Sequence, residues 1–305
     1  MAVIEIHGLR KEYRRFLRGT TIAVSSLDLE VPEGGVFGFL GPNGAGKTTT
    51  IRCLLGLVKP TKGSLRLLGA DVSKDLPSVI RRVGSIVETP SFFPRFSGRR
   101  NLSLLGRLQG VGPKTVTATL ERVGLGERAD DIVKTYSLGM KQRLGIGAAL
   151  LKEPDVLVLD EPANGLDPAG IVEVRQLLRT LGAEGRTIFV SSHQLSEIQQ
   201  MADRVAILAR GECITAGPVA DVLSAGRAQG VVVKLEDPKA GVEALTAAGF
   251  DAVVDRDVIR VKLPPSEAAR VTRALAERGL FLSELRTDEV DLETVFLELT
   301  GDPTP

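Results

Sequence analysis

The stretch GPNGAGKT, at residues 41–48, limits what this chain can fold into more than any other. It fits the pattern G-x-x-x-x-G-K-[ST], in which glycines let backbone N–H groups close around phosphate oxygens. The apolar run VFGFL (36–40) comes directly before it, and apolar residues follow at helical spacing over 51–58. A strand, a glycine loop and a helix in this order predict a phosphate-binding loop within an α/β sheet.

The same loop predicts how a nucleotide and its cation are held. Lys47 is expected to reach the terminal phosphates, and the Thr48 hydroxyl is expected to bind Mg²⁺. A chance glycine turn is the alternative, but the strand before the loop and the helix after it argue against that alternative. The predicted nucleotide-binding residues of the loop are Gly41, Pro42, Asn43, Gly44, Ala45, Gly46, Lys47, Thr48 and Thr49.

Two further apolar runs end in polar residues, namely DVLVLDEP at 155–162 and TIFVSSH at 187–193. Continuous apolar runs of this kind are typical of parallel strands covered on both faces, with chemistry at their carboxyl ends. Asp160 is expected to bind Mg²⁺, directly or through water, and Glu161 to polarise an attacking water. His193 is predicted to sense the γ-phosphate. The alternatives are carboxylates that cap a strand and a structural histidine.

A second anion-binding helix start is predicted in YSLGMKQR, at residues 136–143. Ser137 and the backbone N–H of Gly139 would form the site, with the positive end of a helix dipole behind them. A nucleotide needs only one phosphate cradle. The second cradle therefore requires a separate explanation.

The composition excludes several classes of function. The 305 residues carry a formal net charge of +1, so no overall field favours nucleic acid or an anionic membrane. The two cysteines, Cys53 and Cys213, have neither metal-ligand spacing nor a disulfide framework, which suits a reducing cytosol. Cys53 is interpreted as a core residue. No signal peptide or membrane-spanning run is recognised, so a membrane role would come through a partner.

The rest of the chain predicts two further regions. Short helical patterns between about residues 88 and 150 indicate a helical subdomain inserted into the α/β core. From about residue 220 the order strand, helix, two strands, helix and strand indicates a ferredoxin-like fold, and an amphipathic helix (LETVFLEL) follows. The predicted fold class is an α/β phosphate-loop NTPase core, with a mainly parallel sheet and an antiparallel β subdomain, plus a small α+β domain. The predicted domains are 1–220 and 221–305.

Five segments together carry a resemblance to a known family. They are the phosphate loop at 41–48, the signature YSLGMKQ at 136–142, the Walker B segment at 156–161, the D-loop residues GLD at 165–167, and the switch residue His193. In this order they resemble the ATP-binding cassette (ABC) ATPases, the motor subunits of ABC transporters, and the resemblance extends over about residues 3–220. It implies an ATPase that uses ATP and Mg²⁺.

The resemblance also explains the second cradle. In this family two nucleotide-binding domains dimerise head to tail, and the signature helix of one faces the γ-phosphate held by the other. It implies that Ser137, Leu138, Gly139 and Met140 act on the ATP of a second copy, with Leu166 and Asp167 as the D-loop. An aromatic residue near the N-terminus stacks on adenine in such proteins, and Tyr13 is the candidate, although a plain surface tyrosine is the alternative.

The sequence departs from the family pattern at two places. Glu88 stands where the family usually has a Gln that contacts Mg²⁺ and the attacking water, so it is assigned to the metal and catalytic sites. A carboxylate still offers oxygen to the metal but adds a negative charge. This substitution resembles a bacterial subset of the bacitracin and lantibiotic self-protection type. Leu138 and Met140 replace Gly and Gln of the signature, while Ser137 and Gly139 remain.

The resemblance implies a cytoplasmic motor, peripheral on the membrane through separate permease subunits, that exports a drug, an antibiotic peptide or a lipid. Phe92, Phe93 and Phe96 lie in the loop after Glu88 and are predicted to line a groove for a permease helix, or else to pack under the helical subdomain. No nucleic-acid partner is expected. The alternatives are a soluble ABC ATPase acting on ribosomes or DNA and an importer motor with a regulatory C-terminal domain. The sequence does not identify the cargo.

Overall fold

The computed structural model divides into two compact units, Met1–Val219 and Ala220–Pro305. It describes residues 2–15, 19–88, 90–225, 230–288 and 291–300. The boundary between the two units lies one residue before the predicted domain boundary. That the units are independent domains stays a prediction.

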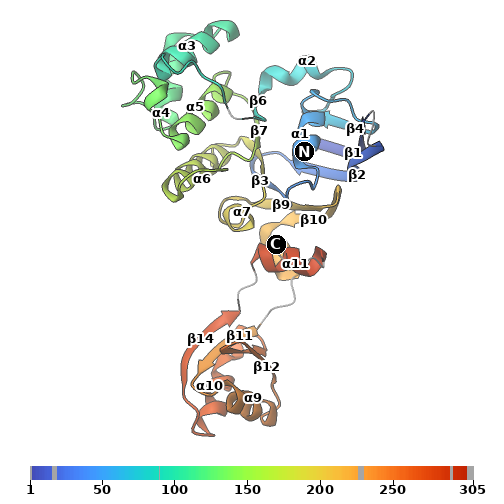
Figure 1. Cartoon of the computed structure of the whole chain (residues 1–305), viewed down its shortest axis with the longest axis vertical. Coiled ribbons are helices and arrows are strands. Elements are labelled where there is room, and N and C mark those ends of the chain that lie inside the picture. The colour runs from blue at the N-terminus through green and yellow to red at the C-terminus, as the bar shows by residue number, and fades with distance from the viewer. Residues whose placement is uncertain (1, 16–18, 89, 226–229, 289–290, 301–305) are drawn as a thin grey trace. The chain divides into compact units, whose positions relative to one another are not determined.

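The first unit is built on one ten-stranded sheet (Figure 1). Its order is β5-β4-β1-β2-β10-β9-β3-β8-β7-β6. The strands are β1 (Ala2–Arg15), β2 (Gly19–Pro32), β3 (Gly35–Leu40), β4 (Lys62–Leu67), β5 (Ala70–Asp71), β6 (Val83–Ile86), β7 (Val156–Asp160), β8 (Thr187–Ser192), β9 (Arg204–Ala209) and β10 (Glu212–Pro218).

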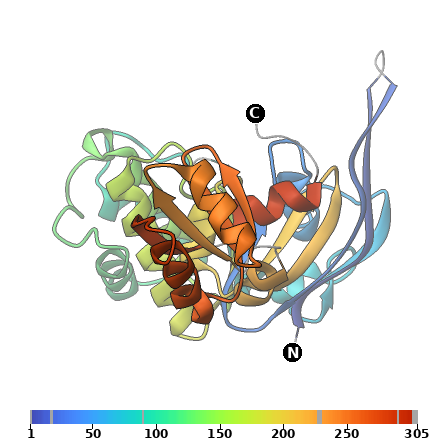
Figure 2. The ribbon, with the colours of Figure 1, turned by 90° about the horizontal axis from the view of Figure 1, so that it is seen from below.

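Two parts of this sheet differ in strand direction. Strands β9, β3, β8, β7 and β6 pair in parallel, whereas β1 pairs antiparallel with β2 and with β4. Figure 2 shows β1 and β2 as a long two-stranded hairpin. The parallel strands are mainly apolar because helices cover both faces of such a sheet, and every residue of β8 is buried, its threonine and two serines included. The predicted fold class is confirmed in this unit.

Three helices form the predicted helical subdomain, which Figure 1 shows grouped on the β6 side of the sheet. They are α3 (Gly98–Gln109), α4 (Pro113–Arg122) and α5 (Leu138–Leu150), with the short η2 (Val133–Thr135) before α5. The other helical segments of this unit are α1 (Lys47–Leu54), α2 (Leu76–Val79), η1 (Ile80–Arg82), α6 (Pro168–Ala183), α7 (Leu195–Met201) and the start of α8 (Val219–Ala225).

The helix after the phosphate loop is shorter than the apolar spacing suggests. The spacing over 51–58 indicated a helix through Val58, but α1 ends at Leu54. Gly56 follows with a φ of +68°, and its N–H donates to the carbonyl of Cys53 at 3.1 Å. A left-handed glycine after the last helical turn is a common helix stop. Cys53 itself is fully buried, and burial raises the pKa of its thiol, as expected for a core residue.

The loop before α3 is anchored by one buried amide. The side chain of Asn101 accepts from the N–H of Phe93 at 2.8 Å through Oδ1 and donates through Nδ2 to the carbonyl oxygens of Phe93, Phe96 and Ser97 at 3.1, 3.4 and 3.0 Å. Asn101 is 3% exposed, so its own polar atoms depend on these partners rather than on water. The amide holds the phenylalanine-rich loop in one conformation.

Replacing Asn101 with Ala should therefore lower the free energy of unfolding by about 1–2 kcal/mol, because the part-buried N–H of Phe93 and several carbonyls lose their partner. Urea denaturation followed by circular dichroism measures this change. The matched control is Gln109→Ala on the same helix, since Gln109 is exposed and its loss should change little. Equal midpoints for both variants would contradict the anchoring role.

The second unit has the predicted order of elements. They are β11 (Gly230–Leu235), α9 (Pro238–Ala247), β12 (Asp251–Asp255), β13 (Val258–Lys262), η3 (Pro265–Glu267), α10 (Ala268–Ala276), β14 (Leu282–Asp288) and α11 (Leu292–Thr300). The sheet order is β12-β13-β11-β14, all antiparallel. Val231 and Val233 of β11 pack with Leu245 of α9 and Leu275 of α10 in one core. The ferredoxin-like prediction for this unit is confirmed.

Candidate functional site

A cavity of about 460 Å³ lies at the carboxyl end of β3, where the sheet meets the glycine loop. The residues that line it come from β2, the loop, α1 and the ends of the two central strands. They are Thr21, Ile22, Ala23, Pro42, Asn43, Gly44, Gly46, Lys47, Thr48, Thr49, Glu161, Asn164 and His193. The phosphate loop, the strand-end glutamate and the histidine therefore share one cavity.

Two glycines of the loop are required by close backbone approach. A Cβ added at Gly41 would lie 2.5 Å from the carbonyl oxygen of Leu208. A Cβ at Gly46 would lie 2.6 Å from the carbonyl oxygen of Ala23, and Gly46 has a φ of +102°. Any other residue at these positions would force the backbone to move. The loop shape needed to surround phosphate depends on both.

Lys47 is held inside the loop. Its side chain is 6% exposed, and its Nζ donates to the carbonyl oxygens of Gly41 at 2.6 Å and Pro42 at 3.3 Å. The same Nζ lies 3.2 Å from Oε1 of Glu161. A buried ammonium needs such partners, and they hold its charge at the wall of the cavity.

Glu161 connects Lys47 to His193. Oε2 of Glu161 lies 2.8 Å from Nδ1 of His193, while Oε1 faces Lys47. The backbone of Glu161 has a φ of +49°, an uncommon value for a residue with a side chain, and its N–H donates to Ser191 Oγ at 3.0 Å. The neighbouring strands β7 and β8 thus aim the carboxylate and the imidazole at the same point.

The Asp160 carboxylate is oriented by the next strand. The Ser191 hydroxyl of β8 donates to Oδ1 of Asp160, which is the last residue of β7. Among the described residues, no three His, Cys, Asp or Glu side chains form a ready metal site. A cation here would be held by few protein oxygens, and the Thr48 hydroxyl and the Asp160 carboxylate are of the hard type that Mg²⁺ prefers.

Glu88 does not line this cavity. Its side chain is 80% exposed, and Oε1 forms an ion pair with Arg52 Nη2 of α1 at 3.1 Å. Glu88 instead borders a second cavity between the core and the helical subdomain. The structure therefore places the carboxylate beside a cation of the protein, and its predicted roles at the metal and the water stay predictions.

Tyr13 also lies outside the residues that line the cavity, within the part of the chain that the structure describes. It pairs across the hairpin with Thr21, and the Lys11 ammonium lies 4.9 Å from the centre of its ring. Ile22 lines the cavity instead and is 51% exposed. An apolar side chain at this rim is suited to a flat base. The stacking role of Tyr13 stays a prediction.

The signature segment lies at an exposed helix start. Ser137 is the N-cap of α5, and its Oγ accepts from the N–H of Met140 at 3.2 Å. Leu138, 45% exposed, is the first residue of α5 and has no positive φ. Gly139 is buried because α6 approaches it, and a Cβ at Gly139 would lie 3.5 Å from the Cα of Gly170.

The D-loop lies at the start of α6. Asp167 is the N-cap of this helix and accepts from the N–H of Gly170 at 3.3 Å. A Cβ at Gly165 would lie 3.5 Å from Cδ2 of Leu138, so the signature and the D-loop are in contact. None of the signature residues lines the nucleotide cavity among the described residues. The predicted second anion site of this copy is therefore separate from the nucleotide cavity.

Sequence reasoning missed several residues of the site. Thr21, Ile22 and Ala23 come from the far strand of the hairpin, and their sequence shows no motif. Asn164 lies between the Walker B strand and the D-loop, so its position could have been noticed. Ser191, which orients Asp160, is one of two serines before His193 and could have been found by the same reasoning.

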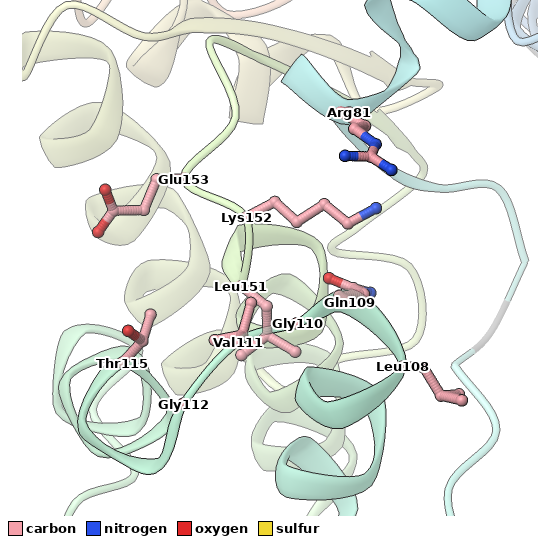
Figure 3. A pocket seen from close by; sticks show the side chains of 10 residues that line it. All are labelled: Arg81, Leu108, Gln109, Gly110, Val111, Gly112, Thr115, Leu151, Lys152 and Glu153. Atoms are coloured by element: carbon pink, nitrogen blue, oxygen red, sulfur yellow. The ribbon is translucent and has the colours of Figure 1, made fainter.

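A groove separates the core from the helical subdomain. One cavity of about 410 Å³ is bordered by residues 83–88 and by Pro90 and Phe92, and a second of about 840 Å³ adjoins it. Gln109 and Lys152 border both cavities. Figure 3 shows Lys152 extending toward Arg81 in the larger one. No helix of the described residues is long and apolar enough to cross a membrane.

Comparisons with known proteins agree with this geometry. A sequence model of the family described as ABC transporter matches residues 24–164. The chain is 39% identical to the bacitracin transport ATP-binding protein BcrA of Enterococcus faecalis, over 98% of this chain and 96% of that protein. It is also 39% identical to the lantibiotic transport ATP-binding protein SrtF of Streptococcus pyogenes, over 70% of this chain and 89% of that protein.

A solved structure gives the same result for the fold. The structure of cbiO1 from Clostridium perfringens, described as part of an ABC transporter complex, superposes with a TM-score of 0.65 at 27% identity. The match covers 73% of this chain and 91% of that chain. That share is close to the length of the first unit, which holds the cavity, the signature and the D-loop.

Proposed function

This chain belongs to the ABC transporter family and is an ATP-hydrolysing subunit of it, and from this premise we propose that it drives export as a head-to-tail homodimer. Separate membrane subunits would form the path, and the cargo would be an antibiotic peptide, a drug or a lipid. The observation that carries the dimer is the exposed start of α5. Ser137 and Leu138 are exposed and do not line the nucleotide cavity of their own copy, so they are available to a second copy.

ATP would enter the cavity with its phosphates in the loop. Lys47 would exchange the carboxylate of Glu161 and the loop carbonyls for phosphate oxygens, which are equally good acceptors for an ammonium. That exchange leaves Oε1 of Glu161 free to accept a proton from water. His193 would keep the carboxylate in place through Oε2, so that Glu161 acts as the base and His193 contacts the γ-phosphate.

Mg²⁺ fits the oxygens that the structure provides. Thr48 borders the cavity and Asp160 ends the neighbouring strand, and Mg²⁺ needs only one or two protein oxygens beside water and phosphate. When bound, the ion would neutralise part of the negative charge that the phosphates carry. The hydroxyl of Ser191 fixes one oxygen of Asp160 for this role.

The groove beside the helical subdomain is the proposed docking place of a membrane subunit. Phe92 borders the groove, and Phe93 is 61% exposed beside Phe96, whose ring centre lies 5.2 Å away. Exposed aromatic rings at a groove are typical of protein interfaces. Phe92 lies only a few residues after Glu88. A permease helix bound to this loop would therefore be connected to Val87, which follows β6 and packs against the core.

Transport of an antibiotic is supported by the relatives. Two of them, BcrA and SrtF, are described by transport of bacitracin and of a lantibiotic. The match to SrtF covers only 70% of this chain but 89% of that protein, so a relative with this description needs little beyond the first unit. The second unit would then serve regulation or assembly rather than ATP hydrolysis.

The transport role is tested by expression with a candidate membrane subunit in a bacterial host sensitive to peptide antibiotics. The expected result is ATP-dependent efflux of the antibiotic from everted vesicles and a raised inhibitory concentration, both lost with the Lys47→Ala variant. Co-sedimentation with ribosomes and no membrane association would contradict the proposal and favour a soluble ABC ATPase.

The Lys47→Ala variant should bind ATP roughly 10- to 100-fold more weakly, because a charge-assisted contact to phosphate is lost. Isothermal titration calorimetry with Mg·ATP measures this change. Lys114→Ala, an exposed lysine on α4, is the control and should bind normally. Unchanged affinity for Lys47→Ala would show that phosphate is held elsewhere.

A further inference from the structure

Two ion pairs join α6 and the residue after it to the helical subdomain. In the second turn of α6, Oε2 of Glu173 lies 3.2 Å from Nη2 of Arg143 on α5. After its last residue, Oε2 of Glu184 lies 3.4 Å from Nη2 of Arg122, at the end of α4. A cavity of about 280 Å³ is bordered by both arginines, by Glu173 and by Leu177 and Leu181 of α6. Polar pairs therefore lie beside apolar contacts here.

Arg143 makes more contacts than the other arginine. Its Nη1 donates to the carbonyl oxygens of Val123 at 3.1 Å and Gly124 at 2.9 Å, the two residues that directly follow α4. The side chain is only 13% exposed, so these bonds are shielded from water. A cation at a helix C-terminus also meets the negative end of the dipole. Arg143 thus connects α4, α5 and α6.

Arg143 and Glu173 join two helices, and each helix begins with a segment that is proposed to act on the nucleotide of the second copy. The signature begins α5 and the D-loop begins α6, and the two helices are in van der Waals contact at Gly139 and Gly170, where a Cβ added to Gly139 would lie 3.5 Å from the Cα of Gly170. Arg143 and Glu173 lie about one turn further along the same pair of helices. Two contacts, one at the helix starts and one a turn later, fix both the separation and the rotation of the helices.

We propose that Arg143 and Glu173 are positioning residues that hold the signature start and the D-loop as one rigid surface for the nucleotide of the second copy. This proposal rests on the proposed head-to-tail dimer. Groups that complete a catalytic site must be placed within a fraction of an ångström, because a misplacement of about 1 Å can reduce the rate ~10²-fold. The Arg143–Glu173 pair would supply this placement without contacting ATP.

The test compares Glu173→Gln and Arg143→Lys with Glu184→Gln. All three weaken a pair between α6 and the helical subdomain, but α6 has 16 residues and so places Glu184 about 24 Å from the D-loop. Each variant is measured for turnover, for ATP affinity by calorimetry at low protein concentration, and for melting temperature. In a Glu161→Gln background, light scattering then measures dimer formation with Mg·ATP.

The expected result is a kcat at least ~10-fold lower for Glu173→Gln and Arg143→Lys, with ATP affinity within about twofold of the wild type. ATP-dependent dimer formation should require more ATP or more protein. Glu184→Gln should keep wild-type turnover. The double variant Arg143→Lys/Glu173→Gln should be no slower than the slower single variant, because both changes disrupt one contact.

Three outcomes would overturn the inference. Wild-type turnover of both Glu173→Gln and Arg143→Lys, beside an inactive Ser137→Arg, would leave the dimer intact and remove the positioning role. A loss in Glu184→Gln equal to that in Glu173→Gln would assign the effect to general stability. Normal turnover of Ser137→Arg would instead remove the proposed dimer, and the positioning role with it.

Discussion

Glu161→Gln should hydrolyse ATP at least ~10²-fold more slowly than the wild type while still binding it, since a positioned general base contributes about that factor. The amide keeps the shape of the carboxylate and can still bond to His193, but it cannot accept a proton from water. It also removes the charge that now faces Lys47 at 3.2 Å. Phosphate release at saturating Mg·ATP measures the rate, and calorimetry measures the affinity.

The same variant tests the head-to-tail dimer. With hydrolysis blocked, ATP should remain between two copies, and light scattering should show a change from monomer to dimer only with Mg·ATP. The matched control is Glu153→Gln, a glutamate with the same unusual backbone region (φ +50°) that does not line the cavity. Turnover equal to the wild type in Glu161→Gln would show that another group activates the water. A dimer regardless of ATP would assign the joint to the second unit.

Ser137→Arg should abolish cooperative turnover and leave ATP binding to a single copy unchanged. Ser137 is exposed and does not border its own nucleotide cavity, so a longer side chain there meets no ATP of the same copy. In the dimer an arginine side chain would occupy the space of the γ-phosphate and remove the N-cap acceptor of Met140. Turnover measured against protein concentration, with calorimetry for binding, separates the two effects.

The control for Ser137→Arg is Ser97→Arg. Ser97 is likewise an N-cap, of α3, and its Oγ accepts from the N–H of Arg100 at 3.2 Å. Losing either cap should cost about 1 kcal/mol of stability, so the two variants share that effect. Only Ser137→Arg should lose cooperative turnover. Normal hydrolysis by Ser137→Arg would show that the signature helix does not act on a second copy.

Much of the site could be predicted because its signals are local. The phosphate loop joins a strand to a helix within a few residues, and Asp160 and Glu161 follow an apolar strand directly. Such patterns reflect backbone geometry that neighbouring residues determine. The same holds for the helix start at Ser137 and for the order of elements in the second unit. Sites formed by residues that are adjacent in the sequence could therefore be predicted from the sequence alone.

The remaining features depend on contacts between distant segments. The cavity takes Ile22 from the far strand of a hairpin, while Tyr13 faces Lys11, because strand register decides which side chains meet the cavity. Glu88 has its partner on α1, since Arg52 is the cation that the fold brings nearest to it. Neither the lining of the cavity by Ile22 nor the ion pair of Glu88 could be predicted from a local sequence pattern.

What the sequence alone determined is the kind of chemistry: a nucleotide loop and acidic strand ends, together with the prediction of a second anion site at residues 136–143. Only the tertiary structure decided that Lys47, Glu161 and His193 converge in one cavity, because β3, β8 and β7 are neighbours in the sheet. It also decided that Arg143 meets Glu173, two residues far apart in the chain. Packing of long-range neighbours sets such pairs, whereas local backbone preferences set the motifs.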